Sequence, residues 1–454
     1  MTMDYDVVVV GGGTAGGPAA VQAARLGART LLVEKNGALG GTTTVAGVSL
    51  PGLFHAWGHQ VIAGIGWETV SRSVREAGLS LPDFTRWDLP HHRLQVRVSP
   101  AVLAAVLDDT VVSAGAELLL HAIVAEAEHD ADGWRLALAT KDGLHRVRAG
   151  AVVDCTGDAD IVALAGLPRR TPPRRQPGTI MVRLGGYDLA AIDVDAVQAA
   201  HDDAVQRGDL MPADLAHNTV GKFLRVRGEN AIHVTGVQGG TSRDKTAAEL
   251  AGRRTLLRIL RFLRRQPGLE DVRIESWAVE TGIRESWTID GYATITVGDY
   301  VSGRVWPDAL SNSFYPIDVH RPDGDGIDIR PLPYGTVPTI PRSAMIPRGS
   351  TRMVVAGRAI SGDQDASSAY RVQASSMAMG QSAGVLAARA VATGTDVMDL
   401  PLDVIRADLR AHGAILPGDV VIPPLPDNRP AQAGQGRTAA TAGPSDPSPT
   451  KESA

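Results

Sequence analysis

The chain has 454 residues, and its 44% hydrophobic and 21% charged side chains are typical of an ordinary globular protein. Its formal net charge of -5 is small for this length, so we expect neither nucleic acid nor a membrane surface as a partner. The single cysteine, Cys155, excludes an internal disulfide and a Cys-x-x-Cys redox pair, so any redox chemistry must use a bound cofactor.

The N-terminus has no features of a targeting segment. Asp4 and Asp6 stand where a signal peptide would be basic, and the apolar run that follows covers only Val7 to Val10. No window holds the ~18 consecutive apolar residues that a membrane-spanning helix requires. We therefore expect a cytoplasmic protein.

A glycine-rich loop lies between the first predicted strand and the first predicted helix. The run that ends at Val10 is typical of a buried parallel strand, and the Ala-rich segment 14–26 predicts a helix. Between them, Gly11 would allow a tight turn, Gly13 would let the backbone approach a pyrophosphate, and Gly16 would let the helix pack closely on the strand. The phosphates would lie at the helix N-terminus, where free N–H groups and the helix dipole favour negative charge.

The next strand, "TLLVE", ends at Glu34. A carboxylate about 20 residues after such a loop is suited to hydrogen-bond a ribose diol. It also disfavours a 2′-phosphate, so the sequence predicts a dinucleotide site that does not take NADP. At this point both FAD and NAD remain open.

The elements that follow are more typical of a flavoprotein than of a plain NAD domain. Gly40-Gly41 leads into three threonines, which could approach a second phosphate or a ribityl chain. Residues 99–113 predict a helix that begins with an N-cap serine and a proline. Strand-like segments then alternate with turns at Asp132-Gly133 and Asp142-Gly143, and a further buried strand ends in Thr156-Gly157-Asp158.

Several motifs together carry a resemblance to a known family. They are the Gly11 loop, Glu34, "LGGTTT", "DCTGDAD", "ETGIRESW" and "VVAGRAISGDQDASSAYRVQASSMAMGQSAGVLAARA". Over most of residues 5–395, the sequence resembles the FAD-dependent oxidoreductases that share a nucleotide-binding domain with glutathione reductase and the fumarate reductase flavoprotein. The resemblance implies FAD as the cofactor.

The implied fold is α/β, with a Rossmann-like FAD-binding domain, made of a parallel sheet with helices plus a β-meander, and an inserted α+β substrate domain. The expected division places the first part of the FAD-binding domain at 1–165, the inserted domain at 166–345 and the closing part at 346–400. A C-terminal helix and extension would follow at 401–422. Residues 423–454 are rich in Pro, Ala, Gly, Ser and Thr and predict a disordered tail.

The resemblance also implies which residues contact FAD. Ile123 or Val124 would contact the adenine through the backbone, and the absence of a histidine from "GGTTT" implies a dissociable cofactor. The other expected FAD contacts are Gly11, Gly13, Thr14, Ala15, Gly16, Glu34, Lys35, Gly41, Thr42, Thr156, Gly157, Asp158, Gly357, Asp363, Arg371 and Gln373.

Histidines are the first candidates for proton transfer, because their ordinary pKa lies near neutrality. His55 and His59 lie among aromatic residues in a stretch that the family places over the flavin, and His320 is a further candidate. The alternatives are hydrogen-bonded packing histidines and a turn histidine. We expect no metal site, since no carboxylate or cysteine cluster completes one.

Arg284 and Glu285 match a family motif directly. Arg284 could anchor a substrate carboxylate or stabilise charge on the flavin, because its planar fork is suited to bidentate contact. The alternative is a buried structural ion pair between Arg284 and Glu285. Arg371 aligns more loosely with the catalytic arginine region of fumarate reductases.

These observations predict an enzyme that removes a hydride from a small organic substrate, at a C–OH, C–N or CH–CH bond, and delivers it to flavin N5. The electrons would pass to oxygen or another acceptor, since no second Gly-x-Gly-x-x-Gly stands in strand–turn–helix context. A flavin-dependent double-bond reductase and a flavin-binding subunit of a larger redox complex are the alternatives. The oligomeric state is left open.

Overall fold

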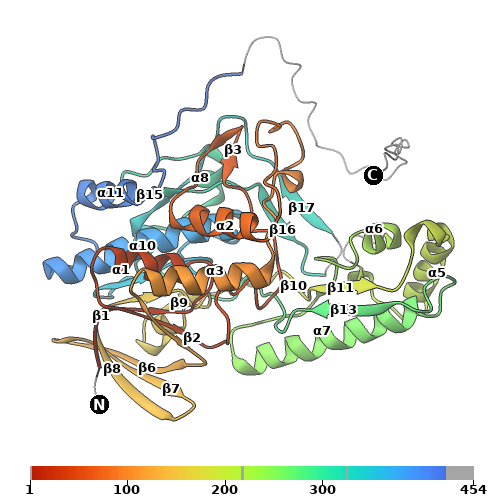
Figure 1. Ribbon diagram of the computed structural model, residues 1–454, viewed down its shortest axis with the longest axis horizontal. Coiled ribbons are helices and arrows are strands. Elements are labelled where there is room, and N and C mark those ends of the chain that lie inside the picture. Colours follow the sequence, from red (N-terminus) through yellow and green to blue (C-terminus); the bar gives the residue numbers. More distant parts are fainter. Residues whose placement is uncertain (1–2, 216–218, 324–325, 426–454) are drawn as a thin grey trace. The chain divides into compact units, whose positions relative to one another are not determined.

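The computed structural model describes residues 3–215, 219–323 and 326–425 (Figure 1). Residues Met1–Ile422 form one compact unit. The tail predicted for 423–454 falls almost entirely on 426–454, which lie outside the described residues. Of the helices that the structure describes, none combines the length and the apolar character needed to cross a membrane.

A seven-stranded sheet forms the centre of the main core, in the order β5-β2-β1-β8-β7-β6, with β19 also paired to β8. β1, β2, β5, β8 and β19 run parallel where they pair, whereas β6, β7 and the first part of β8 form an antiparallel meander. The predicted combination of parallel sheet and β-meander is confirmed. The strands are β1 Met3–Val10, β2 Thr30–Glu34, β5 Glu117–Leu120, β6 Ile123–Asp130, β7 Gly133–Thr140, β8 Gly143–Asp154 and β19 Met353–Val355.

The sequence explains the position of β1 at the centre of the sheet. Val7, Val8, Val9 and Val10 are all buried, as expected for a strand covered on both faces. The helices associated with this sheet are α1 Gly16–Arg25, α2 Ile65–Glu76, α3 Pro100–Ser113, α4 Asp160–Leu164, α10 Gln373–Thr393 and α11 Leu402–Ala411.

Helices α1 and α10 pack closely because of two glycines. A Cβ atom on Gly380 would lie 2.0 Å from the Ala15 carbonyl oxygen, and one on Gly384 would lie 2.4 Å from the Ala19 carbonyl oxygen. Backbone cannot yield at such distances, so only glycine fits at either position. The contact holds the N-terminus of α10 beside the glycine-rich loop.

The chain between β8 and β19 contributes to two different hydrophobic cores. A second core is built from residues between Ile180 and Val272, and Ile283 packs against it. Figure 1 shows its helices α5 and α6 at one end of the compact unit, away from β1 and β2, and the long helix α7 running from there toward the middle. Its elements are β10 Gly178–Thr179, β11 Val182–Gly185, α5 Val194–Gln206, α6 Val220–Arg225, β12 His233–Val234, α7 Ser242–Leu263 and β13 Arg273–Trp277.

The later part of the predicted insertion packs differently. Ile289, Leu310, Ile340 and Ile346 belong to the main core, together with the strands of the large sheet. The boundary predicted at 345 therefore does not coincide with the boundary between the cores. The elements of this part and the remaining small elements are β3 His55–Ala56, β4 His59–Gln60, β9 Arg169–Arg170, β14 Thr288–Ile289, α8 Val297–Ser302, β15 Ala309–Asn312, β16 Ile317–His320, β17 Ile327–Arg330, β18 Thr339–Pro341 and α9 Gln364–Tyr370.

Candidate cofactor and substrate site

The three glycines of the loop between β1 and α1 each meet a different spatial demand. Gly11 has a positive φ of 96°, and a Cβ there would lie 2.5 Å from the Cys155 carbonyl oxygen. A Cβ on Gly16 would lie 1.8 Å from the Gly11 carbonyl oxygen, whereas a Cβ on Gly13 would have no atom within 4 Å. Gly11 and Gly16 are thus required by the fold, and Gly13 leaves open space beside the N-terminus of α1.

Glu34 and the second glycine pair fix the shape of this loop. The Glu34 carboxylate accepts the backbone N–H of Gly12 at 2.6 Å and that of Asn36 at 2.8 Å. The Gly40 N–H donates to the Gly12 carbonyl at 2.8 Å, and a Cβ on Gly41 would lie 3.1 Å from Gly13 Cα. The "LGGTTT" segment therefore lies directly against the glycine-rich loop.

A cavity of about 640 Å³ extends from this loop to a cluster of partly buried charged side chains. The volume lies within the range typical of small-molecule and cofactor sites. Its lining includes nearly all the residues predicted to contact FAD, namely Gly11, Gly13, Thr14, Ala15, Glu34, Lys35, Gly41, Thr42, Ile123, Val124, Thr156, Gly157, Asp158, Gly357, Arg371 and Gln373.

Two residues predicted to contact FAD do not line the cavity. Gly16 lies against Gly11, where its role is the close packing that was also predicted for it. Asp363 is the N-cap of α9; its carboxylate accepts the N–H groups of Ala366 at 2.8 Å and Val297 at 2.7 Å. Each Asp363 oxygen thus accepts one backbone N–H within the protein, and its contact with the cofactor stays a prediction.

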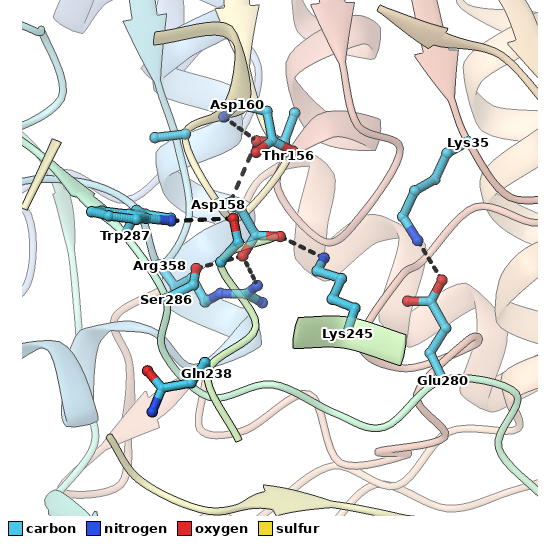
Figure 2. A network of polar contacts seen from close by, with 12 residues as sticks. Lys35, Thr156, Asp158, Asp160, Gln238, Lys245, Glu280, Ser286, Trp287 and Arg358 are labelled. Carbon is cyan, nitrogen blue, oxygen red and sulfur yellow. Dashed lines mark hydrogen bonds and ion pairs between the residues drawn. The ribbon is translucent and has the colours of Figure 1, made fainter. Parts of the chain in front are cut away.

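Asp158 is the centre of an ionic network beside the cavity (Figure 2). Its buried carboxylate contacts Lys245 Nζ and Arg358 Nη2, each at 2.6 Å, and accepts the Ser286 hydroxyl. Burial alone would raise the pKa of Asp158, but Arg358 and Lys245 outweigh it and hold that pKa far below its ordinary value. Lys245 and Arg358 also line the cavity, and neither was predicted from the sequence.

A second ion pair crosses the same cavity. Lys35, which follows β2, pairs with Glu280, which follows β13, and both residues line the cavity (Figure 2). The Asp158–Lys245 and Lys35–Glu280 pairs therefore connect the main sheet region with the segments of the second core.

At the other end of the cavity, four charged or titratable residues gather from distant parts of the chain. Arg284, Asp318, His320 and Arg371 all line the cavity, together with Tyr315. Burial lowers the pKa of Arg284 to about 9, and the charge of Arg371 adds to this effect, so Arg284 is still protonated at neutral pH. Arg284, His320 and Arg371 were predicted candidates, whereas Asp318 and Tyr315 were missed.

His320 is buried and has one ring nitrogen engaged by another histidine. His320 Nδ1 lies 3.1 Å from His233 Nε2, and His320 Nε2 lies 3.5 Å from Asp318 Oδ1. Burial lowers the pKa of His320 to about 4, and Arg284 repulsion adds to this against the opposing effect of Asp318. His320 is therefore neutral near pH 7, with Nδ1 against His233 and Nε2 toward the Asp318 carboxylate.

Glu285 does not line the cavity. Its carboxylate accepts the Gln176 backbone N–H at 2.6 Å, the Gln176 side-chain amide at 2.9 Å and the Gln364 side-chain amide at 2.8 Å. No ion pair within 4.0 Å joins it to Arg284 in the described part of the chain. The geometry thus supports neither the catalytic contact nor the ion pair considered from the sequence.

His55 and His59 also lie outside the cavity lining. His55 stacks on Phe84 with ring centroids 3.7 Å apart and an interplanar angle of 4°, and burial lowers its pKa to about 4. His59 is exposed on the short strand β4. The structure does not bring these two histidines to the Arg284 cluster. His55 packs on Phe84, but its Nδ1 is buried without a hydrogen-bond partner among the described residues, and His59 is not a packing residue.

The comparisons with known proteins define the class. Residues 6–409 match the family described as FAD dependent oxidoreductase, so the chain belongs to this family of flavoproteins. Its cofactor is FAD. The predicted family and cofactor are thereby confirmed.

Individual relatives match shorter regions. The chain is 28% identical to digeranylgeranylglycerophospholipid reductase 2 of Methanothermobacter thermautotrophicus over 206 residues, which cover 42% of this chain and 49% of that protein. It is 57% identical to dihydrolipoyl dehydrogenase of Trypanosoma brucei brucei over 53 residues, which cover 12% of this chain and 11% of that protein. The matched segment thus spans about half the length of the reductase and about a tenth of the length of the dihydrolipoyl dehydrogenase.

Among solved structures, the chain is similar to a geranylgeranyl bacteriochlorophyll reductase-like protein from Thermoplasma acidophilum, with 13% identity and a TM-score of 0.43 over 90% of this chain and 84% of that chain. It is also similar to the OxyS anhydrotetracycline hydroxylase from Streptomyces rimosus, with 16% identity and a TM-score of 0.42 over 90% of this chain and 66% of that chain.

The residues around the cavity fit FAD. The missing side chain of Gly13 leaves space at the N-terminus of α1, where free backbone N–H groups suit a pyrophosphate. Glu34, held by two backbone N–H groups, is in place for a ribose, and Ile123 and Val124 line the adjacent wall. Gln373 and Ser376, at the start of α10, line the region toward Arg371.

Proposed function

We propose that this flavoprotein removes a hydride from a small organic molecule, at a C–OH, C–N or CH–CH bond, while His320 accepts the accompanying proton. The observation that carries the proposal is the single cavity that joins the glycine-rich loop to His320, Arg284 and Arg371. When bound, FAD supplies the two-electron acceptor for such a reaction. The chain's own residues supply position, charge and a proton acceptor.

His320 is suited to the role of proton acceptor because it is neutral at the start of the reaction. Its contact with His233 occupies Nδ1 and orients the ring, and the proposal assigns Nε2, which faces the Asp318 carboxylate, to receive a proton from the substrate. Once protonated, the ring is stabilised by the Asp318 carboxylate, whose oxygen lies 3.5 Å from Nε2. Burial limits competition from water.

The electron acceptor is part of the same proposal. Since the sequence has no second glycine-rich dinucleotide motif, we infer that oxygen or another external acceptor takes the electrons rather than a nicotinamide bound in its own domain. This favours an oxidase or dehydrogenase, in the cytoplasm, that acts on a small molecule.

Reduction of a carbon–carbon double bond is the second candidate. It is favoured by the similarity to digeranylgeranylglycerophospholipid reductase 2 from two archaea, at 28% identity for Methanothermobacter thermautotrophicus and 31% for Methanopyrus kandleri, each over 42% of this chain. In that direction His320 would deliver a proton to carbon instead of accepting one.

The first experiment is anaerobic. The purified protein is examined for a flavin spectrum, the chromophore is released by denaturation and identified by mass, and then alcohols, amines and acids are screened for bleaching of the bound flavin. Bleaching by one class supports hydride removal. No bleaching by any compound, together with reoxidation of chemically reduced enzyme by unsaturated compounds, would favour the reductase instead. Activity that requires added cell extract would indicate a subunit of a larger complex.

A further inference from the structure

Among the described residues, the two arginines at the substrate end of the cavity have only neutral hydrogen-bond acceptors. Arg284 donates to the Pro177 carbonyl. Arg371 donates to the Ser368 carbonyl at 3.3 Å, to the Gln176 side-chain oxygen at 3.2 Å and to the Asp318 carbonyl at 3.2 Å. Within the part of the chain that the structure describes, neither guanidinium has a carboxylate oxygen within 4.0 Å.

The carboxylates near these arginines are already occupied or turned elsewhere. Glu285 accepts the N–H groups of Gln176 and Gln364. Asp318 directs Oδ1 toward His320, 3.5 Å from its Nε2. Both carboxylates offset the arginine charges at longer range, but neither forms a charge-assisted hydrogen bond with these partly buried guanidiniums.

We propose that Arg284 and Arg371 form a subsite for the carboxylate of the substrate, so that the hydride donor is a small carboxylic acid. This inference rests on the proposed function. A carboxylate between the two guanidiniums would accept their remaining N–H groups and relieve their mutual repulsion. Both side chains line the cavity, so a ligand there can reach them.

The local charges sum to zero, so the site accommodates a singly charged anion better than a doubly charged one. Arg284 and Arg371 contribute two positive charges, and Asp318 and Glu285 contribute two negative ones nearby. A doubly charged phosphate would leave more uncompensated negative charge in a buried site than a carboxylate would. The flavin's own pyrimidine edge has the same acceptor chemistry and is the competing occupant that the experiment must separate.

The experiment titrates the FAD-loaded enzyme with pairs of acids and their matched amides, such as benzoate with benzamide and acetate with acetamide. Binding is measured as a change in the visible flavin spectrum, which requires no turnover. We expect acids to perturb the spectrum and amides to bind at least about a hundredfold more weakly, as for loss of a buried charge pair. Inorganic phosphate is included and is expected to bind more weakly than the acids.

The variants are Arg284→Met and Arg371→Met, with Arg284→Lys as the conservative change and Arg243→Met as the matched control. Arg243 is an exposed residue of α7 outside the cavity lining. We expect each cavity variant to weaken acid binding about a hundredfold, Arg284→Lys to restore part of it, and Arg243→Met to change nothing. FAD content and melting temperature confirm that each variant is folded and loaded.

Three results would overturn the subsite. One is equal binding of acids and amides. Another is unchanged acid affinity in both variants with a shifted flavin reduction potential or lost FAD, which would assign the arginines to the cofactor. The third is bleaching by neutral compounds while acids neither bind nor bleach; the proposed function would then survive. Conversely, tight acid binding with no bleaching by any compound would support the subsite and count against hydride removal.

Discussion

The two ends of the cavity are built in different ways. At the cofactor end, Gly11, Gly13 and Glu34 lie close together in the sequence, and the backbone itself forms most of the contacts. At the substrate end, Arg284, His320 and Arg371 come from three separate segments and act through side chains. The first end suits a nucleotide common to a whole family, whereas the second can change its substrate by replacing single side chains.

The largest expected effect distinguishes Gly16, which the fold requires, from Gly13, which leaves space for the cofactor. Gly16→Ala would place a Cβ 1.8 Å from the Gly11 carbonyl, so we expect it to destabilise the fold by ~3 kcal/mol or more, or to abolish soluble expression. Gly13→Val enters open space and should fold normally but retain little FAD. Circular dichroism melts and FAD content measure the two effects. Normal FAD binding by Gly13→Val would mean that the pyrophosphate lies elsewhere.

At the substrate end, replacing His320 should affect chemistry and leave the cofactor in place. For His320→Asn we expect flavin reduction by substrate to slow by about 10²- to 10⁴-fold, because a proton acceptor contributes about that much. FAD content should be unchanged. Rapid-mixing spectroscopy under anaerobic conditions gives the rate, and His59→Asn, at an exposed site outside the cavity lining, is the control. A rate within twofold of the wild-type rate would remove His320 from the mechanism.

The ionic network joins the two ends, and Asp158 is its buried member. Asp158→Asn would leave Lys245 and Arg358 without their shared carboxylate. We expect a loss of about 2 to 3 kcal/mol in the free energy of unfolding, at the low end for buried pairs because both cations are partly exposed. Denaturant melts of Asp158→Asn and of the control Asp160→Asn, whose side chain is 55% exposed, make the comparison. Equal stability of the two variants would show that the network contributes little.

The pH dependence tests the environment of His320 without any substitution. Burial lowers the pKa of His320 to about 4, so the proton-accepting form persists down to that pH. The second-order rate of flavin reduction should therefore fall about tenfold per pH unit only below pH 4, instead of below the ordinary histidine value of about 6.5. A falling limb near pH 6.5 that disappears in His320→Asn would mean that the cavity is more open to water than the structure indicates.

The sequence predicted those features whose residues lie close together in the chain. The glycine loop, Glu34 and the meander depend on local spacing, and all were found. The partners of Asp158 were not, because Arg358 lies 200 positions away and Ser286 lies 128 positions away. The stacking of His55 could not be predicted for a similar reason, since its partner Phe84 lies in a loop with no periodic pattern.

The N-cap role of Asp363 could have been predicted from the sequence, but the residue was assigned to cofactor binding instead. It follows a glycine and precedes a helix, which is the usual setting of an N-cap, and capping is the role it has. The resemblance to the family favoured a cofactor contact at the same position. The two roles are compatible, because a carboxylate can accept more hydrogen bonds than the two that Asp363 accepts here.

The smallest expected effect concerns the other pair in Figure 2, which also crosses the cavity but lies nearer to solvent. The Lys35 side chain is 43% exposed and that of Glu280 is 35% exposed, against 4% for Asp158. A double-mutant cycle with Lys35→Met and Glu280→Gln should give a coupling below ~1 kcal/mol that falls further at high salt, because water and ions screen exposed pairs. Denaturant melts at two salt concentrations measure this coupling. A coupling of several kcal/mol that does not depend on salt would contradict the expectation. The pair would then belong with Asp158 among the buried contacts that hold the second core against the cofactor end.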